Sequence, residues 1–271
     1  MGWHDRLAKS WARSGSLLCV GLDPDPARLP PAVGRGPERL WRFCSAIVDA
    51  TADLVCAFKP QFAHFAAQRA EDQLERLCAH IRDRHPDVVL VLDAKRGDVA
   101  STAEHYASEA FDRYRADAVT VNPYLGTDAA APFLARGGAL ALCRTSNPGS
   151  GELQDLHVDG VPLYQRVARM VAERWSQLGE CGLVVGATYP RQLAEVRSIV
   201  GDLPILLPGV GAQQGELEMS VRAGITRERT GLMVSSSRSI LYASDGADFP
   251  DAARAEAIRT RAAIEAARTG G

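Results

Sequence analysis

The sequence predicts an α/β fold, a (β/α)8 TIM barrel with extra helices at its N- and C-terminal ends. Short apolar segments recur along the 271 residues and alternate with longer amphipathic segments, which is typical of alternating strands and helices. Eight such strands in roughly 250 residues match the size of this barrel. A doubly wound open sheet is the structural alternative. The expected strands cover residues 17–22, 55–58, 88–92, 118–121, 139–143, 182–185, 204–207 and 231–234.

The segments between these strands carry apolar residues at the spacing of an amphipathic helix. Two further helices, over 3–13 and 251–268, lie outside the alternation and are expected to be accessory. The connection 145–161 is long and shows little periodicity, which favours a lid or binding loop at the rim of the barrel. The connection 23–37 is dense in proline and glycine and is either a second rim loop or a plain surface connection. No repeat or interdomain linker is evident, so we expect a single domain over 1–271. The expected helices between strands cover 37–54, 65–84, 102–114, 163–178, 190–200 and 215–223.

Composition narrows the class of partner. The formal net charge is −2 and the arginines are scattered, which argues against nucleic acid as the main partner because no basic block is present to neutralise phosphates. No segment reaches the roughly 18 apolar residues of a membrane span, and the N-terminus lacks the apolar stretch of a signal peptide. Six dispersed cysteines without a C-x-x-C pair favour buried, reduced thiols over a disulfide framework. We expect a cytoplasmic protein that acts on a small molecule, with no nucleic-acid or membrane partner.

Polar residues gather where the expected strands end. In a barrel of this class the active site lies at the C-terminal ends of the strands. The run Asp93-Ala94-Lys95-Arg96-Gly97-Asp98 follows the apolar segment 88–92 directly. Because residues two apart in a strand point the same way, Asp93 and Lys95 should lie side by side, with Asp98 in the next turn. Read along the chain, the strand ends supply Asp23, Lys59, Asp93, Lys95, Asn122, Ser146, residues 208–213, Ser237 and Arg238.

Lys59, Asp93, Lys95 and Asp98 are expected to form one alternating array of charges. Buried charges are costly unless they are paired, and this alternation keeps both lysines protonated and both aspartates ionised at neutral pH. A structural ion-pair network is the alternative interpretation, and Lys59 alone could extend toward water. A magnesium site is disfavoured because magnesium prefers several carboxylates. The histidines and cysteines show no zinc-ligand spacing, and the G-x-S-x-G motif of a serine nucleophile is absent from the sequence.

A phosphate site is expected near the last two strand ends. Gly209 and Gly211 allow close approach of the backbone to an anion, and Arg238 offers a forked donor for phosphate oxygens. Barrels commonly bind phosphate in the loops after strands seven and eight. A plain tight turn is the alternative for the Gly-x-Gly segment alone.

These motifs together resemble the orotidine 5′-phosphate decarboxylase family, and most closely its bacterial branch with the Thr-Ser-Asn-Pro-Gly segment. The resemblance runs in order from the first expected strand, at the Gly-Leu-Asp-Pro segment 21–24, to the eighth, and covers nearly the whole chain. It implies conversion of orotidine 5′-monophosphate to uridine 5′-monophosphate and CO₂, the last step in making pyrimidine nucleotides, with neither metal nor cofactor. The motifs are Phe58-Lys59-Pro60-Gln61, 92–98 with Thr102, Thr145-Ser146-Asn147-Pro148-Gly149, 186–190, 208–213 and 237–240.

The resemblance also implies a role for each site residue. Lys95 protonates C6 of the pyrimidine, Asp93 lies against the substrate carboxylate, and Lys59 and Asp98 complete the charge array. Asp98 and Thr102 reach into the partner's site in relatives, which implies a homodimer with shared active sites. For the substrate, the resemblance implies that Asp23 and Lys59 bind the ribose, Ser146 binds the pyrimidine amide edge, and Gln213 and Arg238 bind the phosphate.

Two alternatives remain open at this point. One is a magnesium-dependent decarboxylase or aldolase of a sugar phosphate in the same suprafamily, whose members carry a carboxylate where this sequence has Lys59. The other is a non-catalytic phosphate-binding barrel, for which loss of Lys95 or Asp93 would be the expected signature. Both residues are present.

Overall fold

Eight parallel strands close into a barrel. The computed structural model describes residues 1–209 and 214–270. The strands follow one another around the ring in the order β1, β10, β9, β8, β5, β4, β3 and β2, so the predicted barrel is confirmed and the open sheet is wrong. The ring consists of β1 (Leu18–Leu22), β2 (Ala57–Pro60), β3 (Val89–Arg96), β4 (Ala118–Val121), β5 (Gly138–Arg144), β8 (Cys181–Val185), β9 (Ile205–Leu207) and β10 (Leu232–Ser236).

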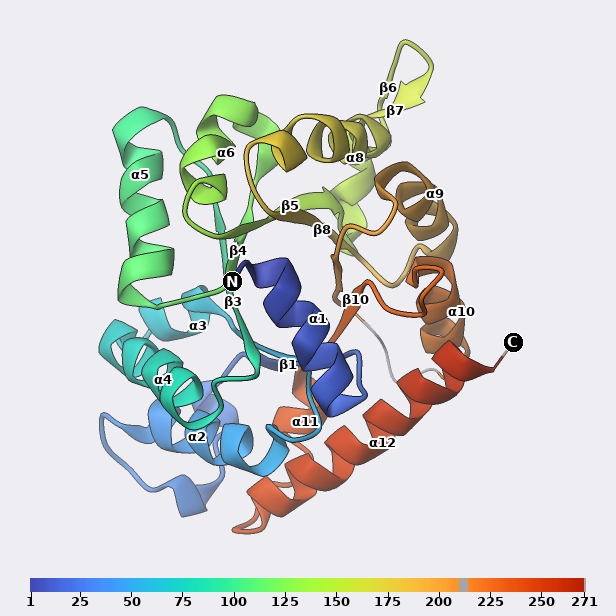
Figure 1. Ribbon diagram of the computed structural model, residues 1–271. Coiled ribbons are helices and arrows are strands. Elements are labelled where there is room, and N and C mark those ends of the chain that lie inside the picture. The colour runs from blue at the N-terminus through green and yellow to red at the C-terminus, as the bar shows by residue number, and fades with distance from the viewer. Residues whose placement is uncertain (210–213, 271) are drawn as a thin grey trace.

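Helices surround the barrel, and a small hairpin of β6 (His157–Val158) and β7 (Val161–Pro162) projects from its edge (Figure 1). Helix α1 (Trp3–Ser14) precedes the first strand and lies outside the alternation, as the sequence predicts. Helix α12 (Phe249–Thr269) was expected to be accessory, but it packs against the helices that follow β9 and β1 and so completes the ring of helices. The surrounding helices are α2 (Arg39–Thr51), α3 (Phe62–Ala66), α4 (Glu71–Arg84), α5 (Ala100–Ser108), α6 (Thr127–Leu134), α7 (Gly151–Gln154), α8 (Leu163–Glu173), α9 (Pro190–Val200), α10 (Gln214–Gly224) and α11 (Arg238–Leu241).

Two helical predictions need correction. The expected helix over 65–84 is two helices, α3 and α4, because the chain turns between them and Arg69 adopts a left-handed backbone with φ 53°. Helix α6 was not predicted, because it has only eight residues and Pro132 lies inside it, which leaves little polar–apolar periodicity to detect. The loop predicted over 145–161 holds the short helix α7 and the β6–β7 hairpin.

Four strands continue beyond their predicted ends: β5 and β10 by one or two residues, and β2 and β3 far enough to include site residues. β2 reaches Pro60 and pairs with β1 through Lys59 opposite Gly21, while β3 reaches Arg96. Lys59, Asp93 and Lys95 therefore lie within strands rather than just after them. The apolar run marks where a strand is buried on both faces, and a strand can continue past that point if its polar side chains find partners.

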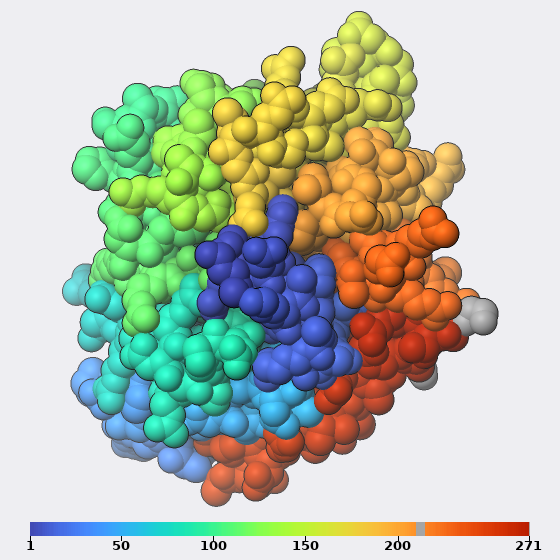
Figure 2. All heavy atoms as spheres, in the orientation of Figure 1, coloured from blue at the N-terminus to red at the C-terminus, as the bar shows by residue number. Residues whose placement is uncertain are grey.

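Helix α1 covers the end of the barrel where the strands begin. Trp3 and Leu7 pack into the cluster of apolar side chains that fills the barrel interior. The hydroxyl of Ser10 donates to the carbonyl of Cys56 at 2.7 Å, and the indole nitrogen of Trp11 donates to the carbonyl of Leu232 at 2.9 Å. Cys56 directly precedes β2, and Leu232 is the first residue of β10. Figure 2 shows α1 in dark blue at the centre of this face, ringed by the other helices.

A second apolar layer lies between the barrel and its helices, so each strand is buried on both faces. All six cysteines fall within the described residues, and each is buried and free, as the sequence predicts. Among the described residues, no helix is both long and apolar enough to cross a bilayer. With one end of the barrel closed by α1, the opposite end holds the polar strand termini.

We expect Leu7→Ala to lower the free energy of unfolding by about 2–5 kcal/mol, because Leu7 is fully buried and its truncation leaves a cavity at the closed end of the barrel. Urea unfolding followed by circular dichroism measures the change. Lys9→Ala is the matched control, since Lys9 lies exposed on the same helix. Equal stabilities of the two variants would show that α1 does not plug the barrel.

Candidate active site

Three charged side chains meet at the open end of the barrel. Two of the chain's three lysines take part, Lys59 from β2 and Lys95 from β3. The Nζ of Lys59 donates to Oδ2 of Asp93 at 2.9 Å, and the Nζ of Lys95 donates to Oδ1 of the same carboxylate at 2.7 Å. The side-by-side placement of Asp93 and Lys95 that the sequence predicts is therefore present.

The charge states of this array follow from its geometry. Burial alone would raise the pKa of Asp93, but the neighbouring charges of Lys59 and Lys95 outweigh it and hold the pKa well below its usual value. Burial alone would lower the pKa of Lys59, but Asp93 and then Asp23 outweigh it and hold the pKa well above its usual value. At neutral pH Asp93 is ionised and Lys59 is protonated. Two buried charges of opposite sign thus stabilise each other.

The backbone at Lys95 departs from regular strand geometry. Lys95 adopts φ 49°, a left-handed conformation that is uncommon for residues other than glycine, and the β3–β4 register shifts between Leu92 and Arg96. Such an irregularity at the rim of a barrel re-aims a side chain. Here it accompanies a Lys95 side chain that is 47% exposed although it contacts the buried Asp93.

Thr120 of β4 stabilises this irregular segment, and our sequence analysis missed it. Its Oγ1 accepts hydrogen bonds from the backbone nitrogens of Ala94 and Lys95, both at 3.0 Å, and donates to Oδ1 of Asp93 at 2.9 Å. The hydroxyl therefore replaces the strand partners that the irregularity removes and orients the carboxylate. The available signal was a hydroxyl residue inside the otherwise apolar segment Ala118–Val121.

Asp23 lies just past β1 and faces the same array. Its Oδ1 is 3.7 Å from the Nζ of Lys59, and within the described residues this buried oxygen has no hydrogen-bond partner. The following backbone is fixed by Tyr242, whose hydroxyl accepts from the nitrogen of Asp25 at 2.6 Å and donates to the carbonyl of Asp23 at 3.3 Å. A buried acceptor without a donor at a cavity wall suits a ligand hydroxyl.

A cavity of about 860 Å³ opens beside these residues, within the size range of small-molecule sites. Arg238, at the start of α11, contributes to its wall and is largely exposed, as a donor to a bound anion would be. Asp23, Lys59 and Asp93 lie on the same cavity. Gln213 and Gly211, expected at the phosphate, lie outside the described residues. The remaining walls come from 208–209, Leu217, residues 235–237, Ser239 and the α12 residues Glu256, Arg259, Thr260 and Ala263.

Two glycines leave room for Ser146 after β5. A Cβ at Gly186, just after β8, would lie 2.8 Å from the Cβ of Ser146. Gly209, just after β9, has φ 82° and would bring a Cβ to 3.3 Å from the Oγ of Ser146. Side chains at these two positions would force Ser146 to move, so the strand ends converge closely around its exposed side chain.

Asp98 and Thr102 do not join the array within one chain. Oδ1 of Asp98 accepts from the backbone nitrogen of Val99 at 2.8 Å, and no ion pair joins Asp98 to Lys95 among the described residues. Thr102 is exposed on the first turns of α5. The alternating array therefore consists of Lys59, Asp93 and Lys95 with Asp23 beside them.

This arrangement can stabilise and protonate a negative charge that develops on a bound molecule. It is poorly suited to a divalent cation, because both oxygens of Asp93 already accept from ammonium groups and a cation there would lie beside two positive charges. The ammonium of Lys95 carries acidic protons, and Asp93 carries a fixed negative charge. The donor set can therefore act as a general acid beside a fixed negative charge.

The chain is similar to known proteins along its whole length. A family model described as the orotidine 5′-phosphate decarboxylase / HUMPS family matches residues 16–248. A protein of Azoarcus sp. (strain BH72) named orotidine 5′-phosphate decarboxylase is 59% identical over 270 residues, covering 99% of this chain and all of that protein. The protein of the same name from Cupriavidus taiwanensis is 57% identical over 272 residues and is covered completely.

Solved structures agree with these sequence matches. The OMP decarboxylase of Leishmania donovani superposes with a TM-score of 0.86 at 35% identity, and 99% of each chain is covered. A putative orotidine-monophosphate decarboxylase from Toxoplasma gondii gives a TM-score of 0.87 at 40% identity, over 98% of this chain and 96% of that one. With a family model that matches most of its residues and relatives of this identity, the chain belongs to the orotidine 5′-phosphate decarboxylase / HUMPS family.

Proposed function

We propose that this chain converts orotidine 5′-monophosphate to uridine 5′-monophosphate and CO₂, the last step in making pyrimidine nucleotides, without metal or cofactor. The observation that carries the proposal is the Lys59–Asp93–Lys95 array, in which one carboxylate accepts from two ammonium groups. The magnesium-dependent relatives carry a carboxylate at the position of Lys59, and a lysine there disfavours their chemistry. The names of the similar proteins support the same substrate.

The difficult step is the formation of a carbanion at C6 of the pyrimidine. The C6–carboxylate bond breaks, the electron pair stays on C6, and CO₂ leaves. The ammonium of Lys95 stabilises the developing charge and then transfers a proton to C6, which leaves a neutral amine that recovers its proton from solvent. Two like charges about 4 Å apart repel by about 4 kcal/mol at an effective dielectric near 20, so Asp93 beside the substrate carboxylate adds a repulsion that ends when CO₂ departs.

The other residues bind parts of the substrate away from the reacting carbon. Asp23 and Lys59 are proposed to bind the ribose hydroxyls, which suits the buried Oδ1 of Asp23 that lacks a donor among the described residues. Ser146, between Gly186 and Gly209, is proposed to bind the pyrimidine amide edge. Arg238 and Gln213 are proposed to bind the phosphate, whose binding free energy can hold the ring against Lys95.

We expect the purified protein to bleach the ultraviolet absorbance of orotidine 5′-monophosphate, before and after EDTA treatment alike. Lys95→Ala should lower kcat by roughly 10²- to 10⁴-fold or more, because it removes both the fixed charge and the proton donor. Binding of uridine 5′-monophosphate, measured by calorimetry, should persist in this variant. Lys9→Ala, which removes the one lysine outside the array, is the control.

Two results would contradict the proposed reaction. An unchanged kcat for Lys95→Ala would remove that residue from the mechanism. Activity that disappears with EDTA and returns with magnesium would instead favour the magnesium-dependent relatives.

We expect Thr120→Val to lower kcat by about 5- to 150-fold with a smaller effect on KM. The substitution leaves the backbone nitrogens of Ala94 and Lys95 without their acceptor, at a cost of about 1–3 kcal/mol. Thr120→Ser should restore most of the rate because the hydroxyl is retained. If Thr120→Val lowers stability but kcat per folded molecule is unchanged, Thr120 does not position Lys95.

We propose further that the functional unit is a homodimer in which Asp98 and Thr102 enter the partner's site. Asp98 and Thr102 do not join the array of their own chain, which supports the proposal. Val99, which lies between them in the sequence, is an exposed apolar side chain that a partner would cover. Lys95→Ala and Asp98→Ala should each be nearly inactive alone. After unfolding and refolding as an equal mixture, they should recover about a quarter of wild-type activity, because half the dimers are mixed and each has one intact site.

The same mixture tests the opposite arrangement. If Asp98 served the site of its own chain, every site in every dimer would carry one defect, and no activity would return. Refolded wild type and each refolded variant alone are the controls for the recovery of folded protein.

A further inference from the structure

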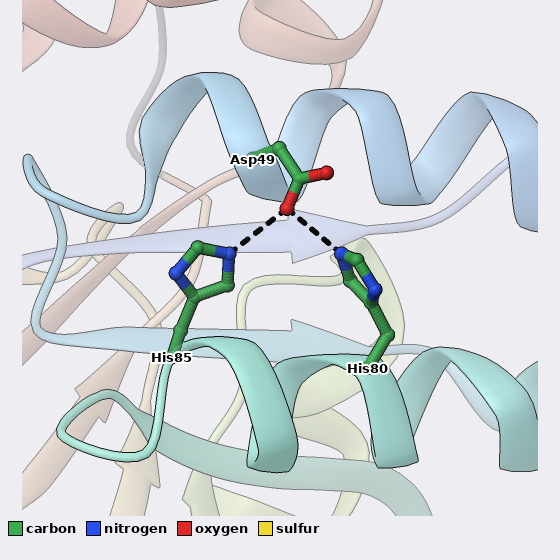
Figure 3. A group of neighbouring side chains, drawn as sticks. All are labelled: Asp49, His80 and His85. Carbon is green, nitrogen blue, oxygen red and sulfur yellow. Dashed lines mark hydrogen bonds and ion pairs between the residues drawn. The ribbon is translucent and has the colours of Figure 1, made fainter.

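A second cluster of ligand-type side chains lies on the outside of the barrel, between α2 and α4. Asp49 lies in the last turns of α2, His80 lies on α4, and His85 follows the end of α4. Figure 3 shows both imidazole rings directed at one oxygen of Asp49. The Nε2 atoms of His80 and His85 lie 2.8 and 2.9 Å from Oδ1 of Asp49.

The distances among these donor atoms suit a small cation. All three lie within 4.8 Å of one another. Zinc bonds of about 2.0–2.1 Å in a tetrahedron place neighbouring ligand atoms about 3.3 Å apart. Each histidine nitrogen would therefore move about half an ångström away from the carboxylate oxygen, and the two histidine nitrogens, which lie within 4.8 Å of each other, would move closer together. The side chain of Asp49 is 51% exposed, which leaves room for water as a fourth ligand.

The two histidines are held before any ion arrives. The ring of His80 packs edge-on against Trp41, with ring centres 6.4 Å apart, and the guanidinium of Arg76 covers the same indole at 3.5 Å. The side chains of His80 and His85 are only 19% and 22% exposed. Ligands restrained in this way lose little conformational entropy when they bind a metal.

We propose that Asp49, His80 and His85 bind one zinc ion that links α2 to α4. Two imidazole nitrogens with one carboxylate form a ligand set that zinc accepts, whereas magnesium prefers sets richer in oxygen. On binding, each histidine coordinates through Nε2 and carries its proton on Nδ1, so neutral histidines release no proton.

The site is separate from the proposed reaction. Asp49 lies near the C-terminal end of α2, which runs from the open end of the barrel back toward the start of β2. The ion would therefore lie toward the end that α1 covers, and the proposal does not depend on the decarboxylation. Sequence spacing could not reveal the site, because five positions separate the histidines and Asp49 lies 31 positions before His80.

The experiment is a titration of the metal-stripped full chain with zinc by isothermal calorimetry. We expect one equivalent to bind and magnesium not to compete. The melting temperature should rise by roughly 5 °C or more at a hundredfold excess of zinc over Kd. His80→Asn, His85→Asn and Asp49→Asn should each weaken binding by at least the roughly 10- to 100-fold that loss of an outer-shell partner costs.

His105→Asn and His157→Asn are the matched controls, since both histidines are exposed and lie on other elements. They should bind zinc as the wild type does. Circular dichroism of the three ligand variants without metal should match the wild type, which separates loss of a ligand from loss of fold. Absence of zinc binding to the wild type, or equal loss in ligand and control variants, would overturn the proposal and leave a carboxylate hydrogen-bonded to two histidines.

Discussion

The ionised, buried carboxylate of Asp93 is the group on which the rest of the site depends. It is stabilised because three donors reach it: the ammonium groups of Lys59 and Lys95 and the hydroxyl of Thr120. Removing one partner of a buried pair typically costs about 3–5 kcal/mol, because the remaining charge is left uncompensated. The three neighbouring strands β2, β3 and β4 each supply one of these donors, so the barrel itself sets the geometry. Asp23, just past the end of β1, extends the same line of charges toward a fourth strand.

The residues that close the barrel and the residues of the proposed active site lie at opposite ends of the barrel. Helix α1 and the apolar side chains that it packs against close the end where the strands begin, whereas the charged array lies at the opposite end. At the open end the structure instead accepts a left-handed backbone at Lys95, which is unfavourable for this residue type. Thr120 offsets that cost by accepting from two backbone nitrogens. A strained residue with dedicated support suits the role of positioned proton donor that we propose for Lys95.

Much of this molecule follows from local sequence patterns. Alternating apolar and amphipathic segments predict the barrel, and the segment 93–98 with Lys59 predicts that Lys59, Asp93 and Lys95 meet. Asp98, expected in the same array, does not join it within one chain. The remainder depends on contacts between distant segments. The role of Thr120 depends on the irregular β3–β4 register, and the residue spacing within a single strand cannot predict that register. Helix α6 was not predicted because its short sequence shows little polar–apolar periodicity. Asp49 contacts His80 only because α2 packs against α4. The arrangement of Asp98 and Thr102 involves, by our proposal, a second chain.

The charge balance at Asp93 bears on how the proposed reaction gains its rate. With Lys59 and Lys95 both protonated, the array carries one net positive charge before Asp23 is counted, and none after it. A substrate carboxylate that binds beside Asp93 therefore meets a set of charges whose sum is near zero. The net repulsion on it is smaller than the repulsion between two isolated carboxylates at the same distance. The attraction between Lys95 and C6, by contrast, grows as the carbon gains charge. Because only interactions that strengthen toward the transition state accelerate the step, we attribute the larger share to the preorganised ammonium of Lys95 and the smaller share to repulsion.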